Sequence, residues 1–319
     1  MLLSLFKSEE NAIAETSLFY PVCLPMPRSL STCVINRRSQ FSASHRYWLD
    51  ELSELENRRR FGKCTRSPGH GHNYVLNVSM ASELDPYGMV LNLTEAKRII
   101  QQQIIDPLDF SYLNDVWPEF QQTLPTTEHI AQVIWQKLTP YLPLVNIQLF
   151  ETPELWADYK GNGMEAYLTV SAHFSAAHRL ALSHLSDEEN SEIYGKCART
   201  NGHGHNYQVE VTVKGEVDAR TGMIVDLAAL NKAIDDHVIE PFDHTFLNKD
   251  VPYFSQVVPT AENIVVRVCN LLRDPVKEIG ATLYKVKISE SPNNSAEVFA
   301  QSCADDALLK IQTQALAAV

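Results

Sequence analysis

The sequence predicts an α+β fold that occurs twice in tandem, each copy containing an antiparallel sheet and two helices. The first observation behind this prediction is an internal repeat: residues 41–76 align without a gap on residues 174–209, and more than half of the aligned positions are identical. The second is the pattern within each copy, where strand-like alternation of apolar residues gives way to helical spacing and then returns.

The repeat extends through most of the chain. Three further blocks match in the same order, namely 88–114 with 222–248, 124–135 with 258–269, and 148–154 with 287–293. A period of about 134 residues is far longer than a solenoid repeat, so each copy should be a complete domain.

The repeat also sets the expected domain boundaries. We place copy one at residues 34–161 and copy two at 162–300, with terminal extensions at 1–33 and 301–319. The boundary falls at the turn signal Gly161-Asn162-Gly163. A join this short predicts that the two copies pack against each other.

Each element of a copy follows from residue spacing. In copy two, alternating apolar residues predict strands at 168–178, 203–213 and 284–290, and the last of these has a twin at 145–151. Helical spacing begins at Leu227 and continues to Val238. A second helix is predicted after Thr260, which is a candidate N-cap.

Composition and charge exclude several classes of protein. The 319 residues suit about two domains of roughly 150 residues each, and 45% hydrophobic with 21% charged residues is the profile of a core-forming protein. A net charge of −12 argues against a nucleic-acid partner. No apolar run approaches the ~18 residues of a membrane span, and Met1–Phe6 is too short for a secretory signal. We therefore expect a cytoplasmic protein with no membrane partner and with reduced cysteines.

Histidines at repeated positions predict a metal site in each copy. A His-x-His pair on a strand places both imidazoles on one face, and a third histidine ends the preceding strand. Three neutral imidazoles leave zinc an open fourth position, which is typical of a catalytic site. The predicted ligands are His45, His70 and His72 in copy one and His178, His203 and His205 in copy two.

A cysteine precedes each His-x-His pair. Cys197, and Cys64 at the same place in copy one, would complete a closed site if they bound metal, so we assign them instead as candidate general bases. Lys196 and Arg199 would favour the thiolate of Cys197.

Carboxylates at two further places are candidate functional residues. Asp243-His244 is suited to proton relay, whereas copy one has Asp109-Phe110 at that place, and phenylalanine cannot carry a proton. Glu290 and Glu151 end apolar strand faces, where a ligand with adjacent N–H donors would satisfy them.

The combined motifs resemble one enzyme family. FSAAH, GKC…GHGHNY, TGMIVDL, DHTFLN, VPTAEN and LYKVKISES are together similar to the 6-pyruvoyltetrahydropterin synthase family, which includes the 6-carboxytetrahydropterin synthases. The resemblance covers 34–160 and 164–300. It implies two tunnelling-fold (T-fold) domains, each a four-stranded antiparallel sheet with two helices, and protomers that assemble into barrels.

The resemblance also implies roles for the residues singled out above. His178, His203 and His205 match the zinc ligands, Cys197 the general base, Asp243 and His244 the relay, and Glu290 the residue that anchors the pterin. One Zn²⁺ per domain is expected. In copy one the triad, Cys64, Asp109 and Glu151 are intact, but Phe110 replaces the relay histidine and Asn92 stands where copy two has Asp226.

The implied function is a zinc-dependent lyase that acts on a small pterin triphosphate. It would convert 7,8-dihydroneopterin triphosphate to 6-pyruvoyl- or 6-carboxy-tetrahydropterin, in pterin or queuosine-type biosynthesis. The alternatives are a pterin-binding assembly protein with little or no turnover and a zinc-assisted hydrolase of a purine-like ring. Copy one is either a structural partner or a contributor to shared sites, in which Cys64 would meet Asp243 and His244. A homo-oligomer is expected, with a trimer of chains favoured because it would supply six domains.

Overall fold

The structure, a computed structural model, describes residues 32–303. Copy one contains β1 (Thr32–His45), α1 (Glu54–Phe61), β2 (His70–Glu83), α2 (Leu93–Ile100), α3 (Asp106–Leu108), β3 (Ser111–Tyr112), α4 (Leu113–Val116), α5 (Pro118–Gln122), α6 (Thr127–Leu138), β4 (Leu144–Thr152) and β5 (Leu155–Tyr159). A 3₁₀ turn (Gly62–Thr65) follows α1, and a π-helical turn (Gln101–Ile105) joins α2 to α3.

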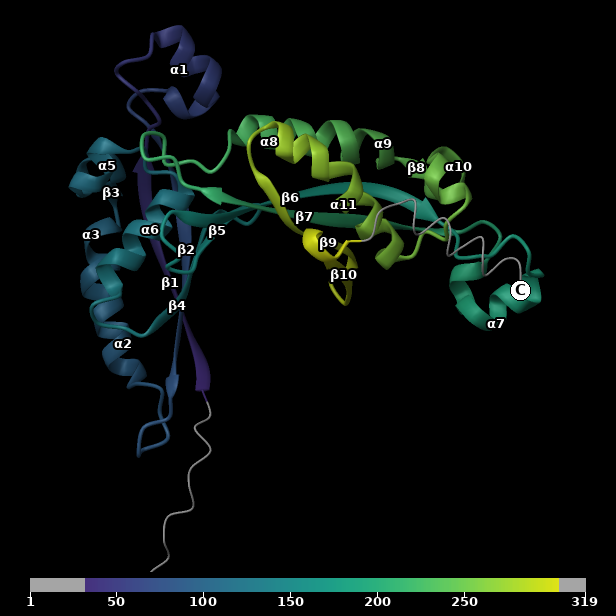
Figure 1. The fold of residues 1–319 in the computed structure, drawn as a ribbon, viewed down its shortest axis with the longest axis horizontal. Helices are drawn as coiled ribbons and strands as arrows, with labels where there is room; N and C mark the ends of the chain where they lie inside the picture. The colour runs from purple at the N-terminus through teal and green to yellow at the C-terminus, as the bar shows by residue number, and fades with distance from the viewer. Residues whose placement is uncertain (1–31, 304–319) are drawn as a thin grey trace, which may run out of the picture. The chain divides into compact units, whose positions relative to one another are not determined.

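Copy two repeats this order (Figure 1). It contains β6 (Glu165–His178), α7 (Asp187–Tyr194), β7 (His203–Glu216), α8 (Leu227–Ile234), α9 (Glu240–Phe242), β8 (Thr245–Phe246), α10 (Leu247–Asp250), α11 (Ala261–Glu278), β9 (Thr282–Ser291) and β10 (Asn294–Phe299). Its 3₁₀ turns are Gly195–Ala198, Pro252–Ser255 and Ala300–Ser302, and its π-helical turn is Asp235–Ile239. The predicted extensions lie outside the described residues, except that Thr32 and Cys33 belong to β1 and 301–303 follow β10.

The strands of both copies form one continuous sheet. Its order is β10-β9-β7-β6-β5-β4-β2-β1-β3, with β8 paired to β6. Within each copy the four long strands are antiparallel, as predicted, and the two-residue strands β3 and β8 are additional parallel pairings. The sequence pattern does not show so short a strand, because two residues carry no periodicity.

One face of each strand set is the core. Alternate residues of β2 from Tyr74 to Met80 are fully buried, as are those of β7 from Tyr207 to Val213. The long helices α6 and α11 pack against β4 and β9 and start at Thr126 and Thr260, whose hydroxyls accept the N–H of the third helical residue. The N-cap role predicted for Thr260 is confirmed. Shorter helices in the connections accompany the two predicted ones in each copy, and several of them add buried residues to the core, such as Leu108 of α3 and Phe242 of α9. Among the described residues, no helix is both long and apolar enough to cross a membrane.

The two copies meet at a contact that we call the internal joint, made of two parts. First, β5 pairs with β6, from Leu155 opposite Val170 to Asp158 opposite Tyr167. Second, the turn 218–224 of copy two contacts the start of α6 in copy one. There the Thr126 hydroxyl donates to the Gly222 carbonyl, and the Ile224 N–H donates to Glu128 Oε1 at 3.2 Å. The predicted packing of copy against copy is thus present.

The connection at 161–163 allows a stability test. Gly161 has φ +78°, and a Cβ there would lie 2.3 Å from Cζ2 of Trp135, whereas Gly163, with φ +64°, has open space. Gly161→Ala should therefore lower the free energy of unfolding by about 2–5 kcal/mol, because steric overlap adds to backbone strain. The control Gly163→Ala carries the strain alone, about 1–2 kcal/mol. Urea denaturation of both variants measures the difference, and equal losses would contradict the overlap with Trp135.

Candidate active site

The histidine triads form where paired strands end. His178, the last residue of β6, lies opposite His203, the first of β7, and His205 follows two residues later on the same face. His45, His70 and His72 have the same arrangement on β1 and β2. In each triad one ring nitrogen of every histidine lies within 4.8 Å of the others. The pairing of strands thus brings together all three predicted ligands in both copies.

Glycine in the GHGH motif allows the close approach of the two strands. A Cβ at Gly202 would lie 2.5 Å from the carbonyl oxygen of His178, and its φ is +64°. A side chain there would push His203 away from His178. The glycine is therefore required by the same geometry that assembles the triad.

The donor set of copy two fits a cation. The Nδ1–H of His178 donates to the Pro259 carbonyl at 2.7 Å, so the Nε2 of His178 carries a lone pair. This Nε2 lies 3.1 Å from Nε2 of His203. Tetrahedral zinc with bonds of about 2.0–2.1 Å would separate two such ligands by about 3.3 Å. His205 Nε2 is buried without a hydrogen-bond partner.

Burial favours the neutral form of four of the six triad histidines. It lowers the pKa of His178 to about 4, and it lowers the pKa of His203 as well. In copy one, burial lowers the pKa of His45 and His70 to about 4. The lone pairs of these four histidines are therefore available at neutral pH, and the neutral imidazole is the form that binds metal.

A cysteine and two glutamates lie beside the triad of copy one. His72 Nε2 is 3.4 Å from Glu151 Oε1, and the Thr127 hydroxyl donates to Glu151 Oε2 at 2.7 Å. Burial, followed by the charge of Glu151, raises the pKa of Cys64. This thiol is therefore held protonated more strongly than a free cysteine, which does not favour it as a base.

Glu128 belongs to this cluster and was missed by the sequence analysis. It is only 4% exposed, and the pKa of Tyr47 is raised first by burial and then by charges that include those of Glu151 and Glu128. In copy two, Glu262 likewise acts on Glu290, whose pKa is raised first by burial. The available signal was the repeated pair TTEH and TAEN, in which only the threonine had been given a role.

The Asp243-His244 pair is held by backbone contacts. Asp243 accepts the Ser175 N–H at 2.7 Å and lies 2.8 Å from His244 Nδ1, and these two contacts lower its pKa in that order. His244 has φ +56°, and its N–H donates to the Ser175 carbonyl at 2.6 Å. Phe110 has the same φ, and Asp109 accepts the Ser42 N–H in the same way.

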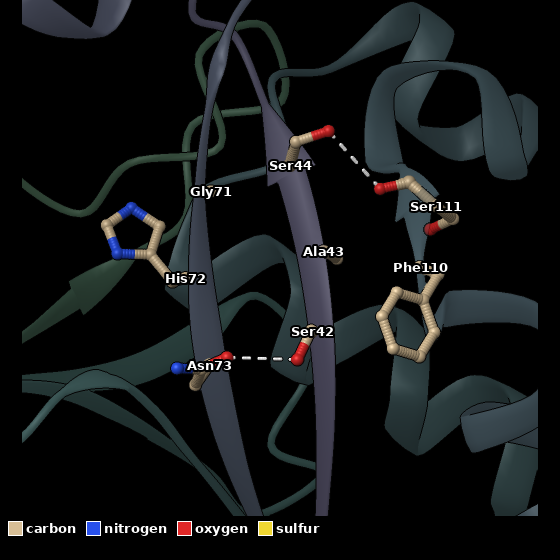
Figure 2. Close-up of a pocket in the computed structure, with 8 residues that line it drawn as sticks. All are labelled: Ser42, Ala43, Ser44, Gly71, His72, Asn73, Phe110 and Ser111. Carbon is tan, nitrogen blue, oxygen red and sulfur yellow. Dashed lines mark hydrogen bonds between the residues drawn. The ribbon is translucent and has the colours of Figure 1, made fainter.

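Phe110 and His244 each border an open pocket whose lining includes one histidine of the same copy's triad. In copy one the pocket is lined by Ser42, Ala43, Ser44, Gly71, His72, Asn73, Phe110 and Ser111. Ser42 and Ser44 alternate with the residues on the triad face of β1. Figure 2 shows the ring of His72 and the side chain of Phe110 on opposite sides of the β1–β2 pair. His244 has the corresponding place in a pocket of copy two.

The buried carboxyl group at the internal joint predicts a pH effect. Burial raises the pKa of Glu128 to about 7, so the folded state holds this proton more tightly than the unfolded chain. The stabilisation is complete below about pH 4.5 and is lost as pH rises through 7. Glu128→Gln keeps an oxygen acceptor for the Ile224 N–H without ionising. At pH 8 its free energy of unfolding should exceed that of the unmodified chain by up to about 3 kcal/mol.

Denaturation at pH 5 and pH 8 measures this difference, which should be small at pH 5. The matched control is Glu262→Gln, because Glu262 has the same place in copy two but is exposed. Parallel pH dependence of Glu128→Gln and the unmodified chain would contradict the prediction.

Several known proteins are similar to parts of this chain. The 6-pyruvoyl tetrahydrobiopterin synthase of Homo sapiens is 48% identical over 134 residues, which cover 42% of this chain and 91% of that protein. A putative 6-carboxy-5,6,7,8-tetrahydropterin synthase of Archaeoglobus fulgidus is 31% identical over 134 residues, covering 42% and 96%. The solved structure of Caenorhabditis elegans 6-pyruvoyl tetrahydropterin synthase is 40% identical, covers 43% of this chain and 96% of that chain, and has a TM-score of 0.40.

The family model has the widest coverage. The model described as 6-pyruvoyl tetrahydropterin synthase matches residues 34–162 and again residues 167–301. The two matches follow the internal repeat and together include both histidine triads. The chain therefore belongs to the 6-pyruvoyl tetrahydropterin synthase family, contains the family's domain twice in tandem, and is an enzyme of the lyase class.

Proposed function

We propose that the chain is a zinc-dependent lyase that converts 7,8-dihydroneopterin triphosphate to 6-pyruvoyltetrahydropterin, with its complete catalytic set in copy two. The observation that carries this proposal is the convergence of His178, His203 and His205, with one ring nitrogen of each within 4.8 Å of the others. Relatives named for the pyruvoyl product reach 48% identity, whereas the relative named for the carboxy product is 31% identical, which supports the pyruvoyl product.

Different residues of copy two would perform different steps of the reaction. Zinc, when bound by the triad, would supply a Lewis acid that stabilises negative charge on the substrate's side-chain oxygens. Cys197 would remove a proton from the substrate side chain. Glu290, partly buried and with a raised pKa, would accept hydrogen bonds from the N–H groups of the pterin ring.

The relay is the part that copy one lacks. Asp243 fixes the His244 ring through Nδ1 and stabilises its charged form, so Nε2 is the atom that would exchange protons with substrate. Because Phe110, its counterpart in copy one, lies on the other side of the β1–β2 pair from His72 (Figure 2), we propose that the dyad serves the copy-two triad of another chain. Copy one, which keeps the metal ligands but has Phe110, would hold zinc and contribute structure with little or no turnover.

The family is generally oligomeric, and we keep the trimer of chains as a specific proposal for this protein. Sedimentation velocity of the zinc-loaded protein should give the mass of three chains. A stable monomer would contradict it. We also propose that the protein works in the cytoplasm without a nucleic-acid partner.

A direct assay tests the function. The zinc-loaded protein is incubated with 7,8-dihydroneopterin triphosphate, and mass spectrometry should detect triphosphate and the pyruvoyl product. Acetaldehyde with a carboxypterin would assign the carboxy branch instead, and absence of turnover would refute the enzyme proposal.

A Cys197 variant tests in the same assay whether this thiol acts as a general base or as a metal ligand. Cys197→Ala should lose turnover by about 10²–10⁴-fold, the usual contribution of a general base, while keeping both metal ions. Cys64→Ala is the matched control and should retain turnover. Loss of metal from Cys197→Ala would show that the thiol is a ligand rather than a base.

A further inference from the structure

The two histidine triads differ in what lies beside them. In copy one, Oε1 of Glu151 is 3.4 Å from Nε2 of His72, and the side chains of Glu151 and His72 are only 10% and 18% exposed. This Nε2 is buried without a hydrogen-bond partner. Glu290 has the place of Glu151 in copy two, but among residues 32–303 it forms no such close contact with His205. A carboxylate thus approaches the triad in copy one and not in copy two.

One hydroxyl group holds the glutamate of copy one. Thr127 donates to Oε2 of Glu151 at 2.7 Å, which leaves Oε1 facing His72. By the repeat, the counterpart of Thr127 is Ala261, which has no hydroxyl to donate. The two residues have equivalent places, because each is the first residue of a long helix, α6 in copy one and α11 in copy two. Copy one therefore fixes its glutamate with a group that copy two lacks.

The spacing in copy one suits a carboxylate that binds metal. Two ligands of tetrahedral zinc lie about 3.3 Å apart. His45 Nε2 and His70 Nε2 are separated by 3.1 Å, and Glu151 Oε1 and His72 Nε2 by 3.4 Å. The group of donor atoms that all lie within 4.8 Å of one another contains the three histidines but not Glu151, so the carboxylate has to turn toward the ion as it binds. The terminal torsion of a glutamate is soft enough for this movement.

Electrostatics favours the same arrangement. If Nε2 of His72 carries the lone pair that a metal ligand needs, it faces a carboxylate oxygen, and two acceptors this close repel each other unless a cation lies near both. Zinc bound by three neutral imidazoles keeps its full double charge, and an unpaired charge is costly in a largely buried place. A glutamate ligand halves this charge, so binding by Glu151 relieves both the repulsion and the cost of burial.

We propose that Glu151 is the fourth ligand of zinc in copy one, which makes this site closed and structural, whereas the site of copy two stays open for substrate. The inference deepens the proposed function, because it rests on the binding of zinc by both triads. A closed site leaves no position for substrate. Zinc then ties the end of β4 to the ends of β1 and β2, and copy one lacks turnover for a second reason besides Phe110.

Cobalt substitution tests the coordination of each copy separately. His203→Ala leaves the copy-one site intact, and His70→Ala leaves the copy-two site intact. Each full-length variant is loaded with one equivalent of Co²⁺, and azide is titrated while the visible absorption of the metal is recorded. Azide should change the spectrum of His70→Ala, because it fills the open position, and should leave the spectrum of His203→Ala unchanged. An azide response from the copy-one site equal to that from copy two would overturn the proposal.

Substitution of the glutamates identifies the ligand. In the His203→Ala background, Glu151→Gln is nearly isosteric and should lower zinc affinity at least about tenfold and create an azide response in the cobalt form. Thr127→Ala, which introduces the residue of copy two, should lower zinc affinity by about 10–100-fold. The matched control is Glu290→Gln in the His70→Ala background, which should change zinc affinity by less than about threefold. Competition with a chromophoric chelator measures these affinities, and equal losses from the two glutamate variants would overturn the assignment.

The metal measurements are independent of turnover, so they separate this inference from the proposed function. A Glu151-dependent, azide-insensitive site in copy one, together with no pterin product from the unmodified protein, would refute the function and leave the closed site in place. Turnover together with an azide response from copy one would support the function and overturn the closed site. Failure of both triads to bind Zn²⁺ or Co²⁺ would overturn both proposals.

Discussion

His203→Ala is expected to reduce bound zinc from two ions per chain to one and to abolish measurable turnover. The ring of His203 contributes the Nε2 that lies 3.1 Å from that of His178, so its loss leaves copy two with two ligands. A bound metal ion supplies several kcal/mol of charge stabilisation, which corresponds to a loss of about 10³-fold or more in rate. Elemental analysis of the purified protein gives the metal content, and the pterin assay gives the rate.

The internal repeat provides the control. His70→Ala removes the corresponding ligand from copy one, so it should also lose one zinc ion. Because Phe110 leaves copy one without a relay, turnover should remain. If His70→Ala abolished turnover as completely as His203→Ala, the assignment of the catalytic set to copy two would be wrong.

His244→Phe is the second change with a large expected effect. It gives copy two the residue found at Phe110, on a backbone with the same φ of +56° and the same N–H donation to a serine carbonyl. The structure should therefore tolerate it. Loss of the proton carrier should lower kcat by about 10²–10⁴-fold, with both zinc ions retained.

The reciprocal change asks whether copy one can be restored. Phe110→His introduces a ring next to Asp109, which is already held by the Ser42 N–H. In the His244→Phe background it should recover part of the lost kcat. A His244→Phe variant with unchanged kcat would show that His244 carries no proton in the reaction.

The predicted tunnelling fold and family are confirmed, and the reason lies in particular residues. The repeat aligns His45 with His178 and the two GHGH motifs with each other. The three histidines of each copy can meet only if the two strands end at these residues, so the motifs predict where the strands end. The role of Glu128 could not be predicted from the sequence, because its raised pKa comes from burial and not from its neighbours in sequence. Likewise, the raised pKa of Cys64 follows from its burial and from the charge of Glu151, which lies far from it in the sequence.

The sequence alone determined the two copies, the strand ends that carry the histidines, and the presence of Phe110 in copy one where copy two has His244. These features depend on residue type and spacing within short stretches of chain. Only the tertiary structure decided which surfaces of the copies meet. The pairing of β5 with β6 joins the copies within one sheet. The turn 218–224 contacts Glu128, which is buried, while its counterpart Glu262 stays exposed. Two related sequences thus acquire different surroundings, because burial depends on what packs against a residue and not on the residue itself.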